Sequence, residues 1–375
     1  MSARISFDRT VGIVLVGTHP WTNTAFDRLP PRPLLPVGHR PLLSYTLSWL
    51  RDGGIGKAAV CANRETQVLE SRLQEFVPAG LEVSYLEDAM PCGTGGAVRD
   101  AAASSDADLF VVADGTAVPH VDLRSVLAAH HARGATVSVV SYAEVMRNGK
   151  PGFQAPTGIY VFNREALAAI PARGFYDIKE NLIPQLHRSG ARIRAYTAEH
   201  PSPRVLDSSS YRAVNEWMVE HMVATRTIPE GYVLSAGCLV HRDAVIARSA
   251  VLVGPVLVGA GASIGSGAVI VGPTSIGCDA VVGSDVLLSR SAVWRRSLLR
   301  DRSVVDRCIV SDDAVVAEGV QAFREVLIPE AARVSNATRT YPVRDAQQRP
   351  PLELLRRMSR AVLAHAVWSR HPAAQ

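Results

Sequence analysis

The sequence predicts two folds in one chain: an α/β domain with a mostly parallel sheet, followed by a parallel β-helix of hexapeptide repeats. Residues 11–223 alternate short apolar runs with segments of helical spacing, whereas residues beyond 228 repeat an aliphatic side chain at every sixth position. A chain of 375 residues can bury the cores of two such domains. We therefore expect domains at 1–225 and 228–320, and a tail at 321–375.

The first domain is expected to alternate strands with helices. Apolar continuity and β-branched content predict strands at 11–16, 58–61, 81–85, 109–113, 136–142 and 158–162. Helical spacing predicts helices at 42–51, 66–76, 96–103 and 123–131. Such alternation implies a parallel sheet covered on both faces, with ligands at the carboxyl ends of its strands.

The second domain is defined by a period of six. Its repeated positions are Val240, Ile246, Leu252, Val258, Ile264, Ile270, Ile276, Val282, Leu288 and Trp294. This is the signature of a parallel β-helix, in which each turn must stack on its neighbours to bury its face. The phase then slips by four residues, to Leu298, Val304, Val310 and Val316, which predicts a bulge or loop at WRRS (294–297).

We interpret this repeat as a stacking and oligomerisation module without chemistry of its own. The alternative is an acyltransferase with His241 as general base, which would have to lie beside a cleft between subunits. The segment VHRDAV (240–245) is an ordinary coil of the repeat, in which a surface histidine is common. The structural interpretation is therefore preferred.

The tail contains a basic amphipathic segment at 350–370. Its apolar stripe consists of Leu352, Leu355, Met358, Val362 and Val367, and Arg356, Arg357 and Arg360 lie largely off that stripe. A helix of this kind can lie on a membrane surface or dock onto protein. Docking onto its own fold or onto a partner subunit is the commoner arrangement and the one we favour.

Composition argues against several classes of protein. The N-terminus has no apolar core of a signal peptide, and no run is long enough to span a membrane. The five cysteines form no CxxC pair, as expected of reduced thiols in a cytoplasmic protein. The net charge of +5 is spread out without interleaved aromatic residues, so no nucleic-acid surface is expected.

Six segments within residues 11–320 carry a family resemblance through their order and spacing. They are VGIVLVG, PRPLLPVGHRPLLSYTLSWLRDGGI, PCGTGGAVRDA, ADGTAVPHVDL, TGIYVFNREAL and FYDIKENLIPQL. Together they resemble the sugar-phosphate nucleotidyltransferases (NDP-sugar pyrophosphorylases), especially the mannose-1-phosphate guanylyltransferase branch. The resemblance implies a Rossmann-like domain with a mixed, mostly parallel sheet, followed by a left-handed β-helix.

The family joins a nucleoside triphosphate to a sugar 1-phosphate and releases pyrophosphate, so its site positions reactants and neutralises charge. The family's glycine-rich loop, placed here without a gap, keeps Gly17. Its two later glycines and both its arginines are replaced, by Thr18, Pro20, Thr22 and Thr24. Arg32 falls at the position of the family's lysine and is the candidate catalytic cation.

The resemblance also implies Mg²⁺ held by aspartates. The family's Asn-Gly-Asp falls on 114–116, so Thr116 stands where the first metal aspartate is expected and Asp114 lies two positions earlier. A hydroxyl is a weak substitute for a carboxylate around Mg²⁺. The second aspartate is assigned to Asp207, although three residues are then missing between it and Tyr211. If activity remains, Asp114 and Asp207 are the expected metal ligands.

The segment beside the nucleotide base and ribose is the best preserved. The expected nucleotide-binding residues are Gly17, Gly93, Thr94, Gly95 and Asp114. A tight turn that opens a helix explains these last glycines equally well. The stretch that holds the sugar is shortened before TGIYVF, and the acidic and basic positions of a family segment are exchanged at 177–181.

These substitutions favour a non-catalytic paralogue over an active enzyme. Losing one preorganised donor costs about 3 kcal/mol of barrier, and several are absent here. We expect a regulatory or scaffolding protein of nucleotide-sugar or polysaccharide metabolism. Its expected partners are a weakly bound nucleotide or nucleotide-sugar, and either further copies of itself in a homo-oligomer or an active paralogue in a hetero-oligomer. The alternative is an active pyrophosphorylase that uses Mg²⁺, such as a mannose-1-phosphate guanylyltransferase.

Overall fold

The structure is a computed structural model that describes residues 9–17, 24–88, 90–145 and 151–329, with the backbone alone at 144–145 and 151–154. The chain forms two compact units. The N-terminal unit contains 1–21, 30–35 and 40–206, and the C-terminal unit contains 22–29, 36–39 and 207–375. The division thus falls before the expected boundary near 225. The replaced loop positions 18, 20 and 22 and the amphipathic segment 350–370 lie outside the described residues.

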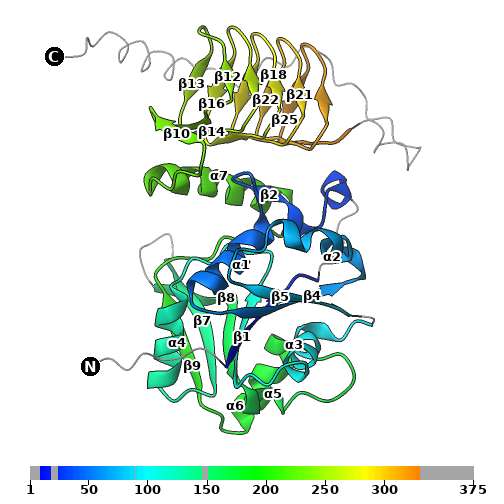
Figure 1. Ribbon diagram of the computed structural model, residues 1–375, viewed down its shortest axis with the longest axis vertical. Coiled ribbons are helices and arrows are strands. Elements are labelled where there is room, and N and C mark those ends of the chain that lie inside the picture. The colour runs from blue at the N-terminus through cyan, green and yellow to red at the C-terminus, as the bar shows by residue number, and fades with distance from the viewer. Residues whose placement is uncertain (1–8, 18–23, 89, 146–150, 330–375) are drawn as a thin grey trace, which may run out of the picture. The chain divides into compact units, whose positions relative to one another are not determined.

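The N-terminal unit is built on a seven-stranded sheet of order β5-β4-β1-β6-β8-β7-β9 (Figure 1). Its strands are β1 (Thr10–Leu15), β4 (Lys57–Asn63), β5 (Glu82–Asp88), β6 (Leu109–Asp114), β7 (Val137–Val145), β8 (Pro151–Asn163) and β9 (Ile193–Ala198). All neighbours are parallel except β8, which pairs antiparallel with both β6 and β7. The predicted mixed, mostly parallel sheet is confirmed, and β9 is a strand that sequence analysis missed.

Helices cover both faces of this sheet. One core contains side chains of α1 (Leu42–Asp52), α2 (Val68–Arg72) and α4 (Leu123–Ala132). The other contains side chains of α3 (Gly93–Ala103), α5 (Arg164–Leu167), the π-helical turn η5 (Ile178–Leu182) and α6 (Ile183–Arg188). Because successive strand residues point to opposite faces, Val14 of β1 joins the first core and Ile13 joins the second.

In the described chain, six short elements lie between the longer strands and helices. They are η1 (Ala25–Arg28), η2 (Arg32–Leu34), β2 (Pro36–Val37), β3 (Arg40–Pro41), η3 (Arg64–Thr66) and η4 (Leu73–Glu75). The helix expected at 66–76 is therefore broken, with 3₁₀ turns on either side of α2.

The C-terminal unit contains helix α7 (Ser208–Ala224) and a parallel β-helix of three sheets (Figure 1). The first sheet is β10 (Tyr232–Ser235), β11 (Cys238–His241), β14 (Val256–Val258), β17 (Thr274–Ile276), β20 (Ala292–Val293), β23 (Ile309–Val310) and β26 (Val326–Leu327). The second is β12 (Val245–Ile246), β15 (Ser263–Ile264), β18 (Val281–Val282), β21 (Leu298–Leu299) and β24 (Val315–Val316). The third is β13 (Val251–Val253), β16 (Val269–Val271), β19 (Leu287–Ser289), β22 (Val304–Asp306) and β25 (Gln321–Phe323).

The coils of the β-helix shorten by one residue partway along. Val271 pairs with Ser289, 18 residues later, but Ser275 pairs with Ala292, 17 residues later. In the longer coil, the corner between Val271 and Ser275 has three residues (272–274). In the shorter coil, the equivalent corner between Ser289 and Ala292 has two (290–291). The shorter corner starts with Arg290 at a positive φ of 45°. All later coils keep the 17-residue spacing.

This shortening corrects the predicted phase of the repeat. The inward row continues from Leu288 to Val293 and Leu299, and later includes Val305, Val310 and Val316. The prediction that Trp294, Leu298 and Val304 point inward is therefore wrong. The slip arises at the corner 290–291, and residues 295–296 form an ordinary turn between β20 and β21.

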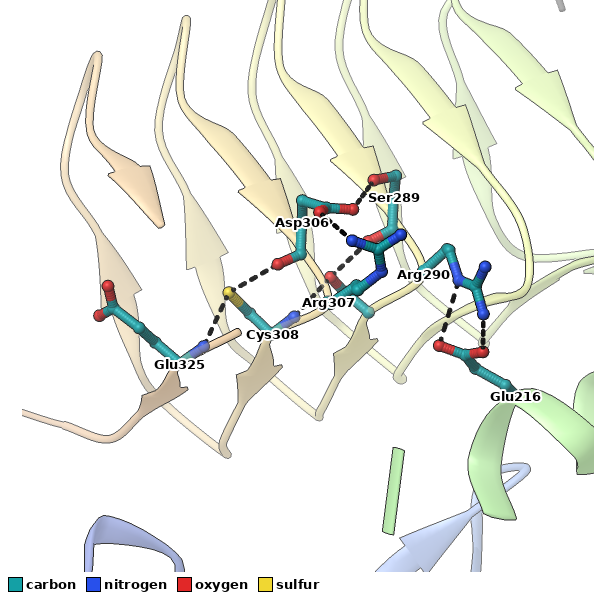
Figure 2. A network of polar contacts seen from close by, with 8 residues as sticks. Glu216, Ser289, Arg290, Asp306, Arg307, Cys308 and Glu325 are labelled. Atoms are coloured by element: carbon teal, nitrogen blue, oxygen red, sulfur yellow. Dashed lines mark hydrogen bonds and ion pairs between the residues drawn. The ribbon is translucent and has the colours of Figure 1, made fainter. Parts of the chain in front are cut away.

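The arginines of the shortened corners are held by acidic side chains, as Figure 2 shows. Arg290 forms an ion pair with Glu216 of α7 at 2.6 Å. Arg307, at φ 52°, pairs with Asp306 at 3.4 Å, and Asp306 accepts a 2.5 Å hydrogen bond from the Ser289 hydroxyl. A positive φ is unfavourable for a residue with a side chain. These contacts therefore stabilise the corner conformation that the shorter coil requires.

Helix α7 joins the β-helix through buried polar groups. The fully buried Tyr211 donates a 2.5 Å hydrogen bond to the Pro36 carbonyl and accepts one of 2.7 Å from Trp294 Nε1. Asn215 donates a 2.9 Å hydrogen bond from Nδ2 to Ser275 Oγ. Trp294 thus faces α7, and its neighbour Val293 takes the inward position of this coil.

We expect Tyr211→Phe to destabilise the C-terminal unit by about 1–3 kcal/mol, because it removes the hydrogen bond to the part-buried Pro36 carbonyl and leaves the buried indole N–H of Trp294 without its partner. Urea unfolding of the full chain, followed by tryptophan fluorescence, measures this. Tyr85→Phe is the matched control, since the Tyr85 hydroxyl is buried without a hydrogen-bond partner among the described residues. Equal effects of the two substitutions would contradict the assigned role of Tyr211.

Candidate functional site

A cleft of about 480 Å³ opens in the N-terminal unit at the carboxyl ends of β1 and β6. Its lining residues are Leu15, Gly17, Arg32, Thr94, Asp114, Thr116, Gly158, Tyr160, Asp177, Ile178, Lys179, Arg204 and Leu206. The cleft thus lies at the strand ends where a ligand was expected. Four of the predicted site residues line it, Gly17, Arg32, Thr94 and Asp114, together with Thr116, which replaces the expected metal aspartate.

The carboxylate of Asp114 is fully engaged by its neighbours. Its Oδ1 accepts hydrogen bonds from the backbone N–H of Thr116 at 2.8 Å and from the Thr116 hydroxyl at 2.7 Å. Its Oδ2 forms an ion pair with the guanidinium of Arg204. The Asp114 side chain is only 15% exposed, so this pairing lies in a largely desolvated place where a charge needs a partner.

Backbone pairing places Arg204 beside Asp114. The segment around Arg204 forms an antiparallel bridge with Ala117. Val205 N–H donates to the Thr116 carbonyl at 2.8 Å, and Val118 N–H donates to the Pro203 carbonyl at 2.8 Å. The chain therefore holds an arginine against the end of β6 by main-chain contacts on both sides.

Sequence analysis missed Arg204, although a signal was present. The assignment of Asp207 as the second metal aspartate required three missing residues before Tyr211. Without that gap, the second metal position falls on residue 204, which is arginine. The structure favours this placement, because Arg204 lines the cleft and contacts Asp114.

Asp207 has a different local role. It is the N-cap of α7, where its side chain accepts a 2.7 Å hydrogen bond from Ser210 N–H and the Ser210 hydroxyl bonds back to the cap. These hydrogen bonds lower the pKa of Asp207 below its ordinary value. Asp207 belongs to the C-terminal unit and is not among the residues that line the cleft.

The glycines at the start of α3 permit a close approach by the chain at Tyr176. Gly93 has a φ of 75°, and a Cβ there would lie 2.6 Å from the Tyr176 carbonyl oxygen. The same carbonyl accepts hydrogen bonds from Gly95 N–H at 2.8 Å and Gly96 N–H at 3.2 Å. These amides are therefore occupied within the fold, which supports the structural interpretation of Gly93 and Gly95.

Thr94 and Asp177 form a second polar group in the cleft. The Thr94 hydroxyl donates a 2.8 Å hydrogen bond to Asp177 Oδ2. Asp177 Oδ1 caps η5 by accepting from Lys179 N–H at 2.7 Å and Glu180 N–H at 3.0 Å. The ammonium of Lys179 remains exposed, and neither it nor Arg32 pairs with a carboxylate among the described residues.

Tyr160 contributes a buried hydroxyl without a partner. The residue is 4% exposed and lines the cleft, and no described residue hydrogen-bonds its hydroxyl. Burial raises the pKa of Tyr160 to about 12, so the phenol stays protonated at neutral pH. Sequence analysis treated Tyr160 only as part of a strand, because its orientation depends on the position of β8 beside β6.

The cleft does not fit a divalent cation. Mg²⁺ requires oxygen ligands, usually from carboxylates, in an octahedral arrangement. Both oxygens of Asp114 are taken, Thr116 offers a hydroxyl, and Arg204 adds a positive charge. Within the described ranges, the cluster of three side chains able to hold a metal is Asp88, Cys92 and Asp100, which do not line the cleft.

His241 contacts residues of its own coil. Its ring meets Tyr232 edge-on at 5.0 Å, and Nδ1 accepts a hydrogen bond from Asp243 N–H at 3.2 Å and lies 3.6 Å from Asp243 Oδ2. The acyltransferase alternative also requires a cleft between subunits, so the assignment of His241 stays a prediction.

The family model described as Nucleotidyl transferase matches residues 27–153. The mannose-1-phosphate guanylyltransferase of Mycobacterium tuberculosis is 24% identical over 200 residues, covering 48% of this chain and 55% of that protein. The UTP–glucose-1-phosphate uridylyltransferase of Synechocystis is 24% identical over 196 residues, covering 43% of this chain and 50% of that protein. The chain thus spans about half the length of these curated relatives.

Among solved structures, HddC from Yersinia pseudotuberculosis superposes with a TM-score of 0.46 at 15% identity, covering 55% of this chain and 98% of its own. HddC complexed with GMP-PN gives 0.45 at 14% identity, with the same coverage of both chains. None of the helices within the described ranges combines the length and apolar character that a bilayer crossing requires.

We expect Asp207→Ala to destabilise α7 by about 1 kcal/mol, and Asp207→Ser, which keeps a capping oxygen, to cost much less. Because folding lowers the pKa of Asp207, the stabilisation is present above the unfolded value near 3.8 and is lost as pH falls through the lower folded value. Urea unfolding at pH 7 and pH 3 measures both effects. Mg²⁺ should not change the unfolding temperature of the native chain or of Asp207→Ser. If Mg²⁺ raises the unfolding temperature of the native chain but not that of Asp207→Ser, Asp207 is a metal ligand.

Proposed function

We propose that the chain is a catalytically impaired sugar-phosphate nucleotidyltransferase of the nucleotidyl transferase family, whose model matches residues 27–153. In this proposal it acts as a regulatory or scaffolding protein in nucleotide-sugar and polysaccharide metabolism. The observation that supports the proposal is the Asp114–Arg204 ion pair, which joins the region that the resemblance assigns to the metal aspartates.

The ion pair removes the metal site in two ways. Arg204 pairs with Oδ2 of Asp114 and Thr116 donates to its Oδ1, so each oxygen already has a partner and the charge is neutralised, and Thr116 stands at the first metal position. A fixed guanidinium can attract phosphate oxygens, but it does not supply the coordination bonds by which a metal ion orients the phosphates and polarises them for transfer. Each lost stabilising group costs about 3 kcal/mol, or about a hundredfold in rate.

An active pyrophosphorylase remains the second candidate, because the cleft keeps Gly17, Arg32 and Asp114 at their expected places. Activity would require the half-exposed Arg204 to leave Asp114 and a metal ion to replace it. Asp114 would then offer one carboxylate where the family uses two aspartates. The geometry therefore supports the impaired paralogue better.

The proposal includes assembly and a location. A β-helix built by stacking coils offers broad faces for association, so we place the protein in a homo-oligomer or in a hetero-oligomer with an active relative. A nucleotide or nucleotide-sugar is the proposed ligand. We place the protein in the cytoplasm, because its five free cysteines suit a reducing compartment.

The decisive experiment is pyrophosphate release by the full chain with Mg²⁺, five nucleoside triphosphates and a panel of sugar 1-phosphates. Turnover numbers of enzymes are usually about 1–1000 per second. We expect turnover at least about ten-thousandfold lower, because two stabilising groups are lost and each loss costs about a hundredfold in rate. The mannose-1-phosphate guanylyltransferase of Mycobacterium tuberculosis serves as positive control. Turnover within the usual range for any substrate pair would overturn the proposal.

Assembly is tested separately by sedimentation velocity of the pure chain, alone and mixed with an active relative encoded in the same genome. We expect either a self-associated species or a mixed complex, and in the second case a changed turnover of the active partner. A monomer that leaves the partner's sedimentation and turnover unchanged would refute the scaffolding role.

A further inference from the structure

We propose that the cleft binds a phosphate monoester without a divalent cation, with Arg204 acting as a built-in replacement for the metal ion. This inference rests on the proposed function, because it assigns the ligand class of the same cleft. In this proposal, cationic side chains of the cleft hold the anion that a metal ion would otherwise help to bind.

The net charge of the cleft indicates how many phosphate groups its ligand carries. Its described lining carries three cations, Arg32, Lys179 and Arg204, and two carboxylates, Asp114 and Asp177, which leaves one net positive charge. A phosphate monoester carries a charge of about −1.5 to −2 at pH 7. A free triphosphate carries about two charges more and normally enters such sites with Mg²⁺. The cleft thus matches one phosphate group.

Side chains, and not helix amides, must hold this phosphate. The first amides of α3 would otherwise be an anion site, but Gly95 and Gly96 donate to the Tyr176 carbonyl. Of the three cations in the described lining of the cleft, Arg32 and Lys179 have no carboxylate partner among the described residues, and Arg204 keeps 41% of its side chain exposed while paired with Asp114. A guanidinium has donors enough to contact a carboxylate and a phosphate together.

Tyr160 independently indicates a ligand. A buried hydroxyl without a partner costs about 1–3 kcal/mol, and such groups are uncommon in native structures. The Tyr160 hydroxyl is such a group, and its residue lines the cleft. A phosphate or sugar oxygen in the cleft would supply the missing partner. A cleft of about 480 Å³ is within the size range of small-molecule sites.

Isothermal titration calorimetry of the full chain in EDTA tests the proposal with four probes: GMP, mannose 1-phosphate, inorganic phosphate and GTP. We expect saturable binding of GMP or mannose 1-phosphate, at least about tenfold tighter than GTP, and less than about a twofold change when Mg²⁺ replaces EDTA. GMP binding alone would identify a nucleoside monophosphate, and mannose 1-phosphate binding alone a sugar phosphate. Binding of inorganic phosphate as tight as both would assign the free anion.

Three variants test the named contacts. Tyr160→Phe should weaken binding by about 2–10-fold and Lys179→Gln by about 10-fold or more, as for neutral and charged hydrogen bonds. Arg204→Asp should abolish binding in EDTA and make any remaining binding depend on Mg²⁺, since it puts a carboxylate at the metal position. Lys57→Gln, at an exposed ion pair with Glu82 away from the cleft lining, is the matched control and should have no effect.

Three results would overturn the inference: no saturable binding of any phosphate monoester in EDTA, binding that requires Mg²⁺, or equal affinities of the native chain, Tyr160→Phe and Lys179→Gln. Tyr160→Phe retains the ring that fills the core, so it keeps the test valid if Arg204→Asp does not fold. Failure here is distinct from failure of the proposed function, which is judged by pyrophosphate release. If the chain binds no phosphate monoester and releases no pyrophosphate, this inference fails and the proposed function stands.

Discussion

The ion pair between Asp114 and Arg204 is the interaction on which the interpretation of this molecule depends. It forms because β6 ends at Asp114 and because the segment before α7 pairs by backbone hydrogen bonds with residues 116–118. Burying one carboxylate without a partner would be costly, so the fold requires a cation at this point. In this chain the cation is covalently part of the protein, and the site is electrostatically complete before any ligand arrives.

Much of the fold follows from periodicity in the sequence. The alternation of apolar runs and helical segments predicts the sheet, and Val14 and Ile13 illustrate how one strand serves both of its faces. The row from Val240 to Leu288 was likewise predictable, because stacking forces an inward aliphatic side chain at each sixth position. Trp294 was misassigned because the corner 290–291 is one residue shorter than the corner 272–274, which moves the inward position to Val293.

The candidate site was predictable only in part, for a related reason. Gly17, Arg32, Thr94 and Asp114 were named from motifs that carry the family resemblance, and they stand at strand or helix ends that meet at the cleft. Arg204 follows no periodic pattern and depends on an irregular bridge to Ala117. The missing partner of Tyr160 is a property of the packed structure alone. Side chains that complete the chemistry of a site often lie in such irregular segments, whose position is set by tertiary hydrogen bonds.

The shortened corner at Arg290 has a consequence for how the β-helix can change in length. Each strand takes its register from the coil before it, so a residue lost at one corner is absent from the same corner of every later coil. Coils before and after residue 290 therefore have different repeat lengths and are not interchangeable building blocks. Lengthening this β-helix by duplication requires copying a coil from the same side of Arg290. This one corner divides the solenoid into a segment of 18-residue coils and a segment of 17-residue coils.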